Sequence, residues 1–113
     1  MIKLIELYKT EYMGQPQYVM YYQEDNGEPV KVLPPRGRWN RSVIIDSLVR
    51  SKYSQDMVEA IVNNHFLNIA EWLDAKFAGS TDKFIDEEYD NMQAWRKECK
   101  FLADEALAKY PAI

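Results

Sequence analysis

Two residues, His65 and Cys99, carry the side chains from which a nucleophilic pair is built, and each type occurs once in the chain. Both fall on or beside apolar stripes at helical spacing, which is typical of a core-edge imidazole and a buried thiol. A catalytic Cys–His pair also requires an exposed thiolate and a third group that orients the imidazole. The chain has no glycine-rich phosphate loop, zinc-ligand spacing or Gly-x-Ser-x-Gly elbow. We therefore predict no catalytic residue, no cofactor and no metal site, and a small enzyme is the least favoured of three hypotheses.

A cluster of cations occupies the segment 36–41, where Trp39 lies among Arg36, Arg38 and Arg41. Guanidinium groups bind phosphates through paired hydrogen bonds, and an indole can stack on a base. The segment also leads into a predicted helix N-terminus, which attracts anions. The second hypothesis is therefore a binder of nucleic acid or another polyanion. In the alternative interpretation, Trp39 fills the seam between sheet and helices, and the arginines pair with acidic residues of the C-terminal half.

Two other charge patterns argue against specific sites. A helix-turn-helix would need cations on its second helix, but residues 53–75 contain no Lys or Arg. The acidic run 86–90 lacks a histidine and a calcium-loop pattern. It lies in the opening turns of the predicted helix, whereas Arg96, Lys97, Lys100 and Lys109 lie later. That order complements the helix dipole, so we interpret the run as a solvated helical face.

The tyrosines of the N-terminal third suggest a recognition surface. On a strand, Tyr18 and Tyr22 point to one side and Tyr21 points to the other, so both faces carry aromatic groups. Helices in a chain this short cover one face of a small sheet, and exposed aromatics are enriched at protein interfaces. Tyr18, Tyr21 and Tyr22 are therefore the candidate partner surface. Alternatively, they are simply good strand formers whose hydroxyls tolerate water.

The elements that position these residues follow from a change in composition. Four of the five prolines and three of the four glycines lie in residues 1–39, which favours strands and turns there and long helices afterwards. Asp25-Asn26-Gly27 is a strong hairpin signal. We predict a single α+β domain over residues 1–113. It has a three-stranded antiparallel sheet at about residues 2–12, 17–24 and 29–33, then helices at about residues 42–52, 55–78 and 82–109.

Polar residues at the predicted helix starts support these boundaries. Asn40 or Ser42 can cap the first helix and Ser54 the second. Ser80 or Thr81 is the predicted cap of the third. The apolar stripe of the second helix runs through Val58, Ile61, Val62, His65 or Phe66, Ile69, Leu73 and Phe77.

Part of the helical half resembles a known group of proteins. The motifs are the segment 46–64 with Lys52-Tyr53-Ser54 at a helix start, then Glu87-Glu88-Tyr89 and Met92-Gln93-Ala94-Trp95-Arg96. Together they resemble small uncharacterised proteins encoded among phage and prophage genes, over residues 46–107. The resemblance implies an accessory or structural role in a phage-derived gene cluster, and it carries over no catalytic residue.

The remaining composition sets the expected environment. The formal net charge is −4, and no run of 18 apolar residues is present, so we expect no membrane span. The lone Cys99 cannot form an internal disulfide, and the N-terminus lacks a signal-peptide pattern, so a reducing, cytoplasmic setting is expected. The first hypothesis is a non-enzymatic interaction module. It binds a protein partner or a second copy of itself, and nucleic acid is a less favoured partner.

Overall fold

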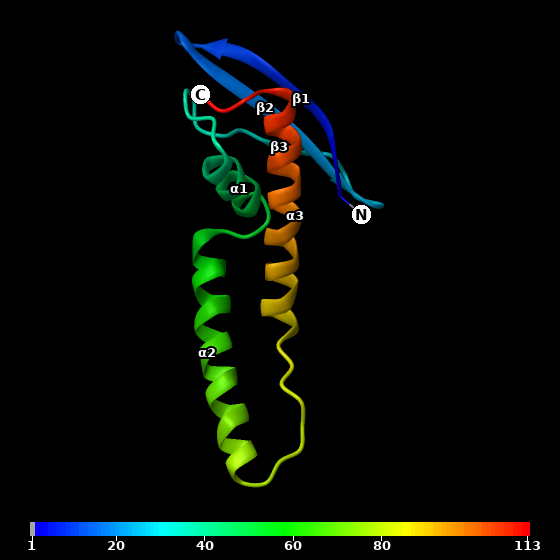
Figure 1. The fold of residues 1–113 in the computed structure, drawn as a ribbon, viewed down its shortest axis with the longest axis vertical. Coiled ribbons are helices and arrows are strands. Elements are labelled where there is room, and N and C mark those ends of the chain that lie inside the picture. The colour runs from blue at the N-terminus through cyan, green and yellow to red at the C-terminus, as the bar shows by residue number, and fades with distance from the viewer. Residues whose placement is uncertain (1) are drawn as a thin grey trace.

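The computed structural model describes residues 2–113, and its elements follow one another in the predicted order (Figure 1). Three strands come first and three helices follow, so the predicted α+β class is confirmed. The elements are β1 (Ile2–Tyr12), β2 (Gln15–Glu24), β3 (Val30–Val32), α1 (Arg41–Arg50), α2 (Gln55–Phe77) and α3 (Glu87–Lys109).

The sheet is an antiparallel meander in the order β1-β2-β3. The turn between β1 and β2 places Met13 at φ 52° and Gly14 at φ 77°, and glycine adopts such a conformation without steric cost. In the second turn, Asn26 takes φ 63° and the Gly27 N–H donates to Glu24 O at 3.0 Å. The Asp-Asn-Gly signal therefore forms the predicted turn.

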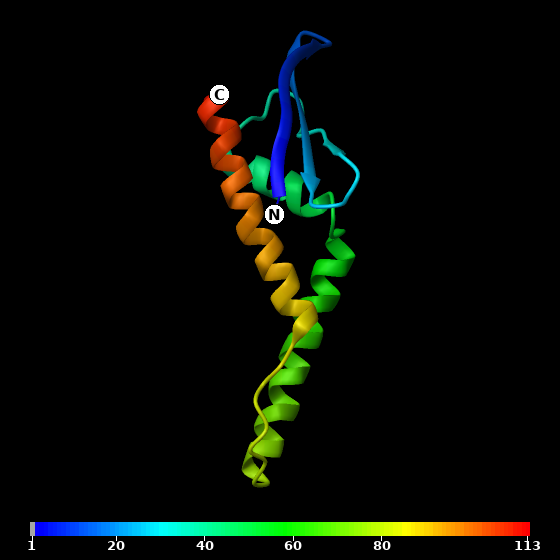
Figure 2. The same cartoon turned by 90° about the vertical axis from the view of Figure 1, so that its right-hand side faces the viewer.

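Helices α1 and α3 cover one face of the sheet and enclose the core (Figure 2). Trp39 lies in this core with 0% of its surface exposed, and its ring stacks on Tyr18 with centroids 4.1 Å apart. Its indole N–H donates to Tyr110 O at 2.7 Å, which connects the start of α1 to the end of α3. Other core side chains are Met20, Ile44, Leu48, Trp95, Cys99 and Leu102. We call the sheet, α1 and α3 the body.

Each helix begins at a capping side chain. Asn40 caps α1 and Ser54 caps α2, in agreement with the sequence. The predicted start of the third helix is wrong, because neither Ser80 nor Thr81 caps it. Asp86 caps α3, so this helix starts at Glu87 rather than at residue 82, and the segment that leads to Asp86 contains no helix.

Helix α2 and residues 78–86 project from the body as an arm (Figures 1 and 2). The molecule measures 62 × 28 × 21 Å, and its radius of gyration of 18.0 Å exceeds the roughly 13 Å of a compact chain of this length. The chain turns at Gly79, whose φ is 99°, and returns along α2 to Asp86. The arm is one helix with one return segment, so it has too few layers to bury every side of α2.

Candidate interaction site

The tyrosines of β2 lie mainly inside the body. Tyr18 and Tyr22 are 4% and 3% exposed, because alternate residues of β2 point toward α1 and α3. The Tyr22 hydroxyl hydrogen-bonds to Ser51 Oγ at 2.8 Å, and burial raises the pKa of Tyr22 above its usual value. The predicted partner surface of Tyr18, Tyr21 and Tyr22 is therefore wrong for Tyr18 and Tyr22, because helices cover their face of the sheet.

Tyr21 lies on the opposite, helix-free face of the sheet. It is half-buried, and the register places it between Glu6 of β1 and Lys31 of β3. On the same face Val19 pairs with Tyr8 and is only 4% exposed. This face is therefore narrow and flanked by both signs of charge, which makes it a weak candidate for apolar docking.

The predicted anion-binding loop does not present its tryptophan. Trp39 is buried, so it cannot stack on a base, and in this respect the alternative interpretation is confirmed. Arg41 Nε lies 2.9 Å from Asp104 Oδ1, and the pKa of Asp104 is lowered mainly by this hydrogen bond. Arg36 lies over the Tyr12 ring at 4.8 Å from its centroid. Arg38 is exposed and has no side-chain partner among residues 2–113, so one of the three guanidiniums is free.

Cations converge instead on an outward face of α3. Arg96, Lys97 and Lys100 line a shallow hollow of about 740 Å³ together with Arg41 of the neighbouring α1. Among the described residues, none of the three α3 cations forms an ion pair. We call these four residues and their surroundings the basic hollow. Sequence reasoning missed it because these cations were assigned to the end of the helix dipole, although their spacing already placed them on adjacent helical turns.

One side of α2 is covered by the return segment of the arm. The Trp72 indole N–H donates to Asp82 O at 2.9 Å, and its ring lies 5.7 Å from that of Phe84. Ile61, on the same side, is the one buried residue that α2 has. Because residues 80–86 pack against α2, they do not form the first turns of α3.

Asp86 joins the return segment to α2 and to α3. Its carboxylate lies 2.9 Å from His65 Nδ1, and it accepts hydrogen bonds from Asn68 Nδ2 at 3.2 Å and from the Tyr89 N–H at 3.3 Å. The hydrogen bond with His65 is the main reason that the pKa of Asp86 lies below its usual value. Asp86 is 9% exposed, so the interpretation of the acidic run as a solvated face is wrong for this residue, although Glu87 is exposed.

His65 and Cys99 belong to different parts of the molecule. His65 stacks on Tyr89 at a centroid distance of 3.5 Å, as an imidazole at the edge of the arm's packing. Cys99 lies in the body core, where burial raises the pKa of its thiol to about 12. The thiol is therefore protonated at neutral pH and is not paired with the imidazole.

An adjacent face of α2 carries an apolar stripe that the described chain covers only in part. Its spacing of three and four residues places five side chains along one face. The exposed fractions are 64% for Phe66, 43% for Leu73 and 90% for Phe77, whereas Val62 and Ile69 are half-buried. We call Val62, Phe66, Ile69, Leu73 and Phe77 the α2 stripe. The sequence predicted one apolar stripe for this helix, and the structure divides it into a covered and an uncovered face.

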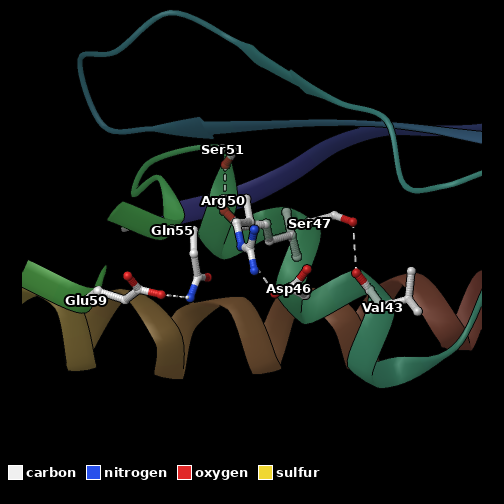
Figure 3. Close-up of polar contacts among 8 residues, drawn as sticks. Val43, Asp46, Ser47, Arg50, Ser51, Gln55 and Glu59 are labelled. Carbon is white, nitrogen blue, oxygen red and sulfur yellow. Dashed lines mark hydrogen bonds and ion pairs between the residues drawn. The ribbon is translucent and has the colours of Figure 1, made fainter. Parts of the chain in front are cut away.

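A short connection at residues 51–54 joins the body to the arm (Figure 3). Arg50 pairs with Asp46 at 3.4 Å within α1, and Gln55 Nε2 donates to Glu59 at 3.0 Å within α2. These contacts stay within their own helices, so they stabilise each helix rather than the angle between them. The first turns of α2 reach the body through Val58, which packs against the core.

No family model, curated protein or solved structure matches this chain. Within residues 2–113, no group of three or more His, Cys, Asp or Glu residues is placed to hold a metal ion. Over the same residues, every helix is too short or too polar to cross a membrane. The α2 stripe and the basic hollow are therefore the two candidate interaction surfaces of the described residues.

Proposed function

We propose that this protein is a non-enzymatic interaction module and that its docking surface is the α2 stripe. The observation that supports this is the exposure of Phe77 and Phe66, at 90% and 64%, on a helix that extends away from the body. Contiguous apolar patches on a protein surface mark sites of association. The interaction class agrees with the sequence hypothesis, but the surface moves from the sheet to the arm.

The geometry of the stripe fits a helical partner. Apolar residues at intervals of three and four form the seam along which one helix packs against another or enters a groove. Most of α2 extends away from the sheet and α1 (Figures 1 and 2). A partner can therefore lie along α2 without displacing the body.

Photo-crosslinking in living cells tests this proposal. The photo-reactive amino acid p-benzoylphenylalanine replaces Phe77, which belongs to the stripe. The matched control places it at Phe101, which is 60% exposed on α3 and lies outside the stripe, at the wall of the basic hollow. We expect a covalent protein adduct from position 77 and none from position 101. Adducts that are absent at 77, or equally abundant at both positions, would contradict the proposal.

A second candidate function is polyanion binding at the basic hollow. Three cations without an ionic partner among the described residues line one hollow in a protein of net charge −4. Such a site would neutralise phosphates, and its affinity would fall steeply as salt rises. This moves the runner-up hypothesis from the segment 36–41 to α3, with Arg41 common to both sites.

Fluorescence anisotropy with a labelled single-stranded oligonucleotide tests the second candidate. The triple variant Arg96→Ala/Lys97→Ala/Lys100→Ala is compared with Lys3→Ala/Lys31→Ala/Lys83→Ala, which removes the same charge elsewhere. We expect the first triple variant to lose roughly tenfold or more in affinity at low salt and the control to lose much less. If the two variants lose equal affinity, binding depends only on the net charge of the protein, and the basic hollow is not a specific site.

The expected setting is consistent with the interaction module. We propose a reducing, cytoplasmic environment, because the lone thiol of Cys99 is buried and makes no disulfide. The resemblance to phage-encoded proteins suggests that the module serves an assembly encoded by a phage-derived gene cluster. Its partner would then be a protein of that assembly or a second copy of this chain.

A further inference from the structure

The apolar residues of the α2 stripe recur at similar intervals in either direction along the helix. If two copies of α2 are laid side by side in opposite directions, Phe66 of one faces Ile69 of the other. In the same register Val62 faces Leu73, and Phe77 comes to the level of Val58, which lies outside the stripe and packs against the body core. The two inner layers of the stripe are therefore matched by apolar residues across the pair, and Phe77 meets the edge of the partner's body. We propose that the occupant of the stripe is a second copy of this chain, bound antiparallel to form a homodimer. This inference rests on the proposed function and names its partner.

The charges at the two ends of the stripe favour the antiparallel direction. Glu59 lies at the N-terminal end of the stripe, where it accepts a hydrogen bond from Gln55. Lys76 lies at the C-terminal end, where its ammonium is 5.1 Å from the centroid of the Trp72 ring. Both side chains are exposed, so either can turn toward a partner. The antiparallel register brings Glu59 of each copy to the level of Lys76 of the other. A parallel pair would instead set Glu59 against Glu59 and Lys76 against Lys76, and like charges in facing positions oppose association.

The two exposed phenylalanines supply a little over a third of the area that a standard dimer interface buries per copy. A phenylalanine offers 150–250 Å², so the exposed parts of Phe66 and Phe77 alone amount to roughly 300 Å² of apolar surface in each copy. A specific interface buries about 800 Å² per partner, and the other stripe residues with their polar flanks supply the remainder. We expect a dissociation constant on the order of 1–100 µM, because much of this surface is a single helix face.

The shape of the molecule leaves room for this pairing. In the proposed register, residues 58–77 of the two copies lie side by side in opposite directions. The two bodies then lie at opposite ends of the paired arms. The return segment does not block the stripe, because it covers the side of α2 that carries Ile61 and Trp72.

Sedimentation equilibrium of the purified full chain tests the dimer. We expect the apparent mass to rise toward twice the monomer mass as concentration increases. Phe66→Glu/Leu73→Glu should weaken this association at least roughly hundredfold, since charges are buried without partners. Met57→Glu/Leu67→Glu is the matched control, because these residues are 47% and 62% exposed on other faces of the same helix. The control should associate like the parent chain.

A charge exchange tests the direction of pairing. Glu59→Lys should weaken an antiparallel dimer roughly threefold to tenfold, because Lys76 of the second copy then faces a like charge. Adding Lys76→Glu in the same chain should restore the original affinity. In a parallel dimer, Glu59→Lys would exchange one like-charge pair for another, so an unchanged affinity would overturn the antiparallel assignment.

The outcomes separate this inference from the proposed function. A purified chain that stays monomeric at millimolar concentration overturns the homodimer. If position 77 then still crosslinks in cells to a protein of different mass, the interaction module stands. A dimer that Phe66→Glu/Leu73→Glu leaves intact places its interface elsewhere and overturns the inference. A stripe that forms neither dimer nor adduct overturns both.

Discussion

Helices α2 and α3 are both 23 residues long, yet α3 buries six side chains and α2 buries one. The buried residues of α3 include Trp95, Cys99 and Leu102, which pack under the sheet and α1. The uncovered residues of α2 include Phe66 and Phe77, which meet no second layer. The apolar content of a helix therefore does not decide whether its partner lies in the same chain. That depends on how many other elements are near enough to cover it.

This difference assigns separate roles to the two regions. The body contains its own core and closes it with long-range contacts such as the hydrogen bond from Trp39 to Tyr110. The arm is held by a few polar contacts around Asp86 and by packing on one side of α2. Stability should therefore reside in the body, and recognition in the arm.

The largest expected effect is in the body. Trp39→Ala removes the stack on Tyr18 and leaves the Tyr110 carbonyl without its indole donor. We expect the free energy of unfolding to fall by about 3–5 kcal/mol in urea denaturation, the range for deleting a large buried aromatic. Trp72→Ala is the matched control, since that indole also donates to a backbone carbonyl but lies in the arm. If Trp72→Ala lowered the free energy of unfolding by as much as Trp39→Ala, stability would not be concentrated in the body.

The next effect concerns thiol reactivity. Cys99 has no exposed surface, and its pKa is raised to about 12, so a thiol reagent should modify it only when the body opens. Cys99→Ser/Ala78→Cys moves the only thiol to an exposed position in the arm. We expect modification of the native parent chain to be at least about a thousandfold slower than that of this variant at pH 8. Similar rates would show that the body opens as readily as the arm.

Sequence reasoning succeeded where local chemistry decides structure. The alternation of β1 and the Asp25-Asn26-Gly27 turn are local signals, and both predicted elements are confirmed. The predicted start of α3 is wrong. Ser80 has a side chain suited to a helix cap, but residues 80–86 pack against α2 instead of forming a helix. Similarly, a pattern of apolar residues in β2 or α2 cannot show which neighbouring element covers it. Hence Tyr22 was predicted to be exposed, and Phe77 was assigned to a single packed stripe.

A smaller effect should appear as the pH dependence of the arm. The pKa of Asp86 is lower in the folded protein than in the unfolded chain, chiefly through the hydrogen bond with His65. Its contribution is therefore present above the unfolded pKa of about 4 and is lost as pH falls through the folded value. The protection of amides near Tyr89 from NMR hydrogen exchange, relative to Asp86→Asn at the same pH, should therefore decrease as the pH falls below about 4.

Asp90→Asn is the control for this acid effect. Asp90 is exposed in the first turn of α3 and has no ion pair among the described residues. The Asp90 variant should therefore retain the acid-dependent loss of protection, whereas Asp86→Asn should have lost part of that protection already at neutral pH. If the two variants behave alike, the Asp86 contacts do not hold the arm to α3.

The smallest expected effect on stability is at the most exposed phenylalanine. Phe77 is 90% exposed, so Phe77→Ser removes almost no contact within the chain. In dilute monomer, the free energy of unfolding should change by less than about 0.5 kcal/mol, as for surface substitutions in general. Met20→Ala, which empties a fully buried position of β2, should cost about 2–5 kcal/mol in the same urea titration. A stability loss from Phe77→Ser that approaches that of Met20→Ala would mean that the chain covers its own stripe, and the docking surface would no longer exist. If stability is unchanged while association weakens, Phe77 serves contacts outside the chain, because its side chain then contributes to binding and not to the fold.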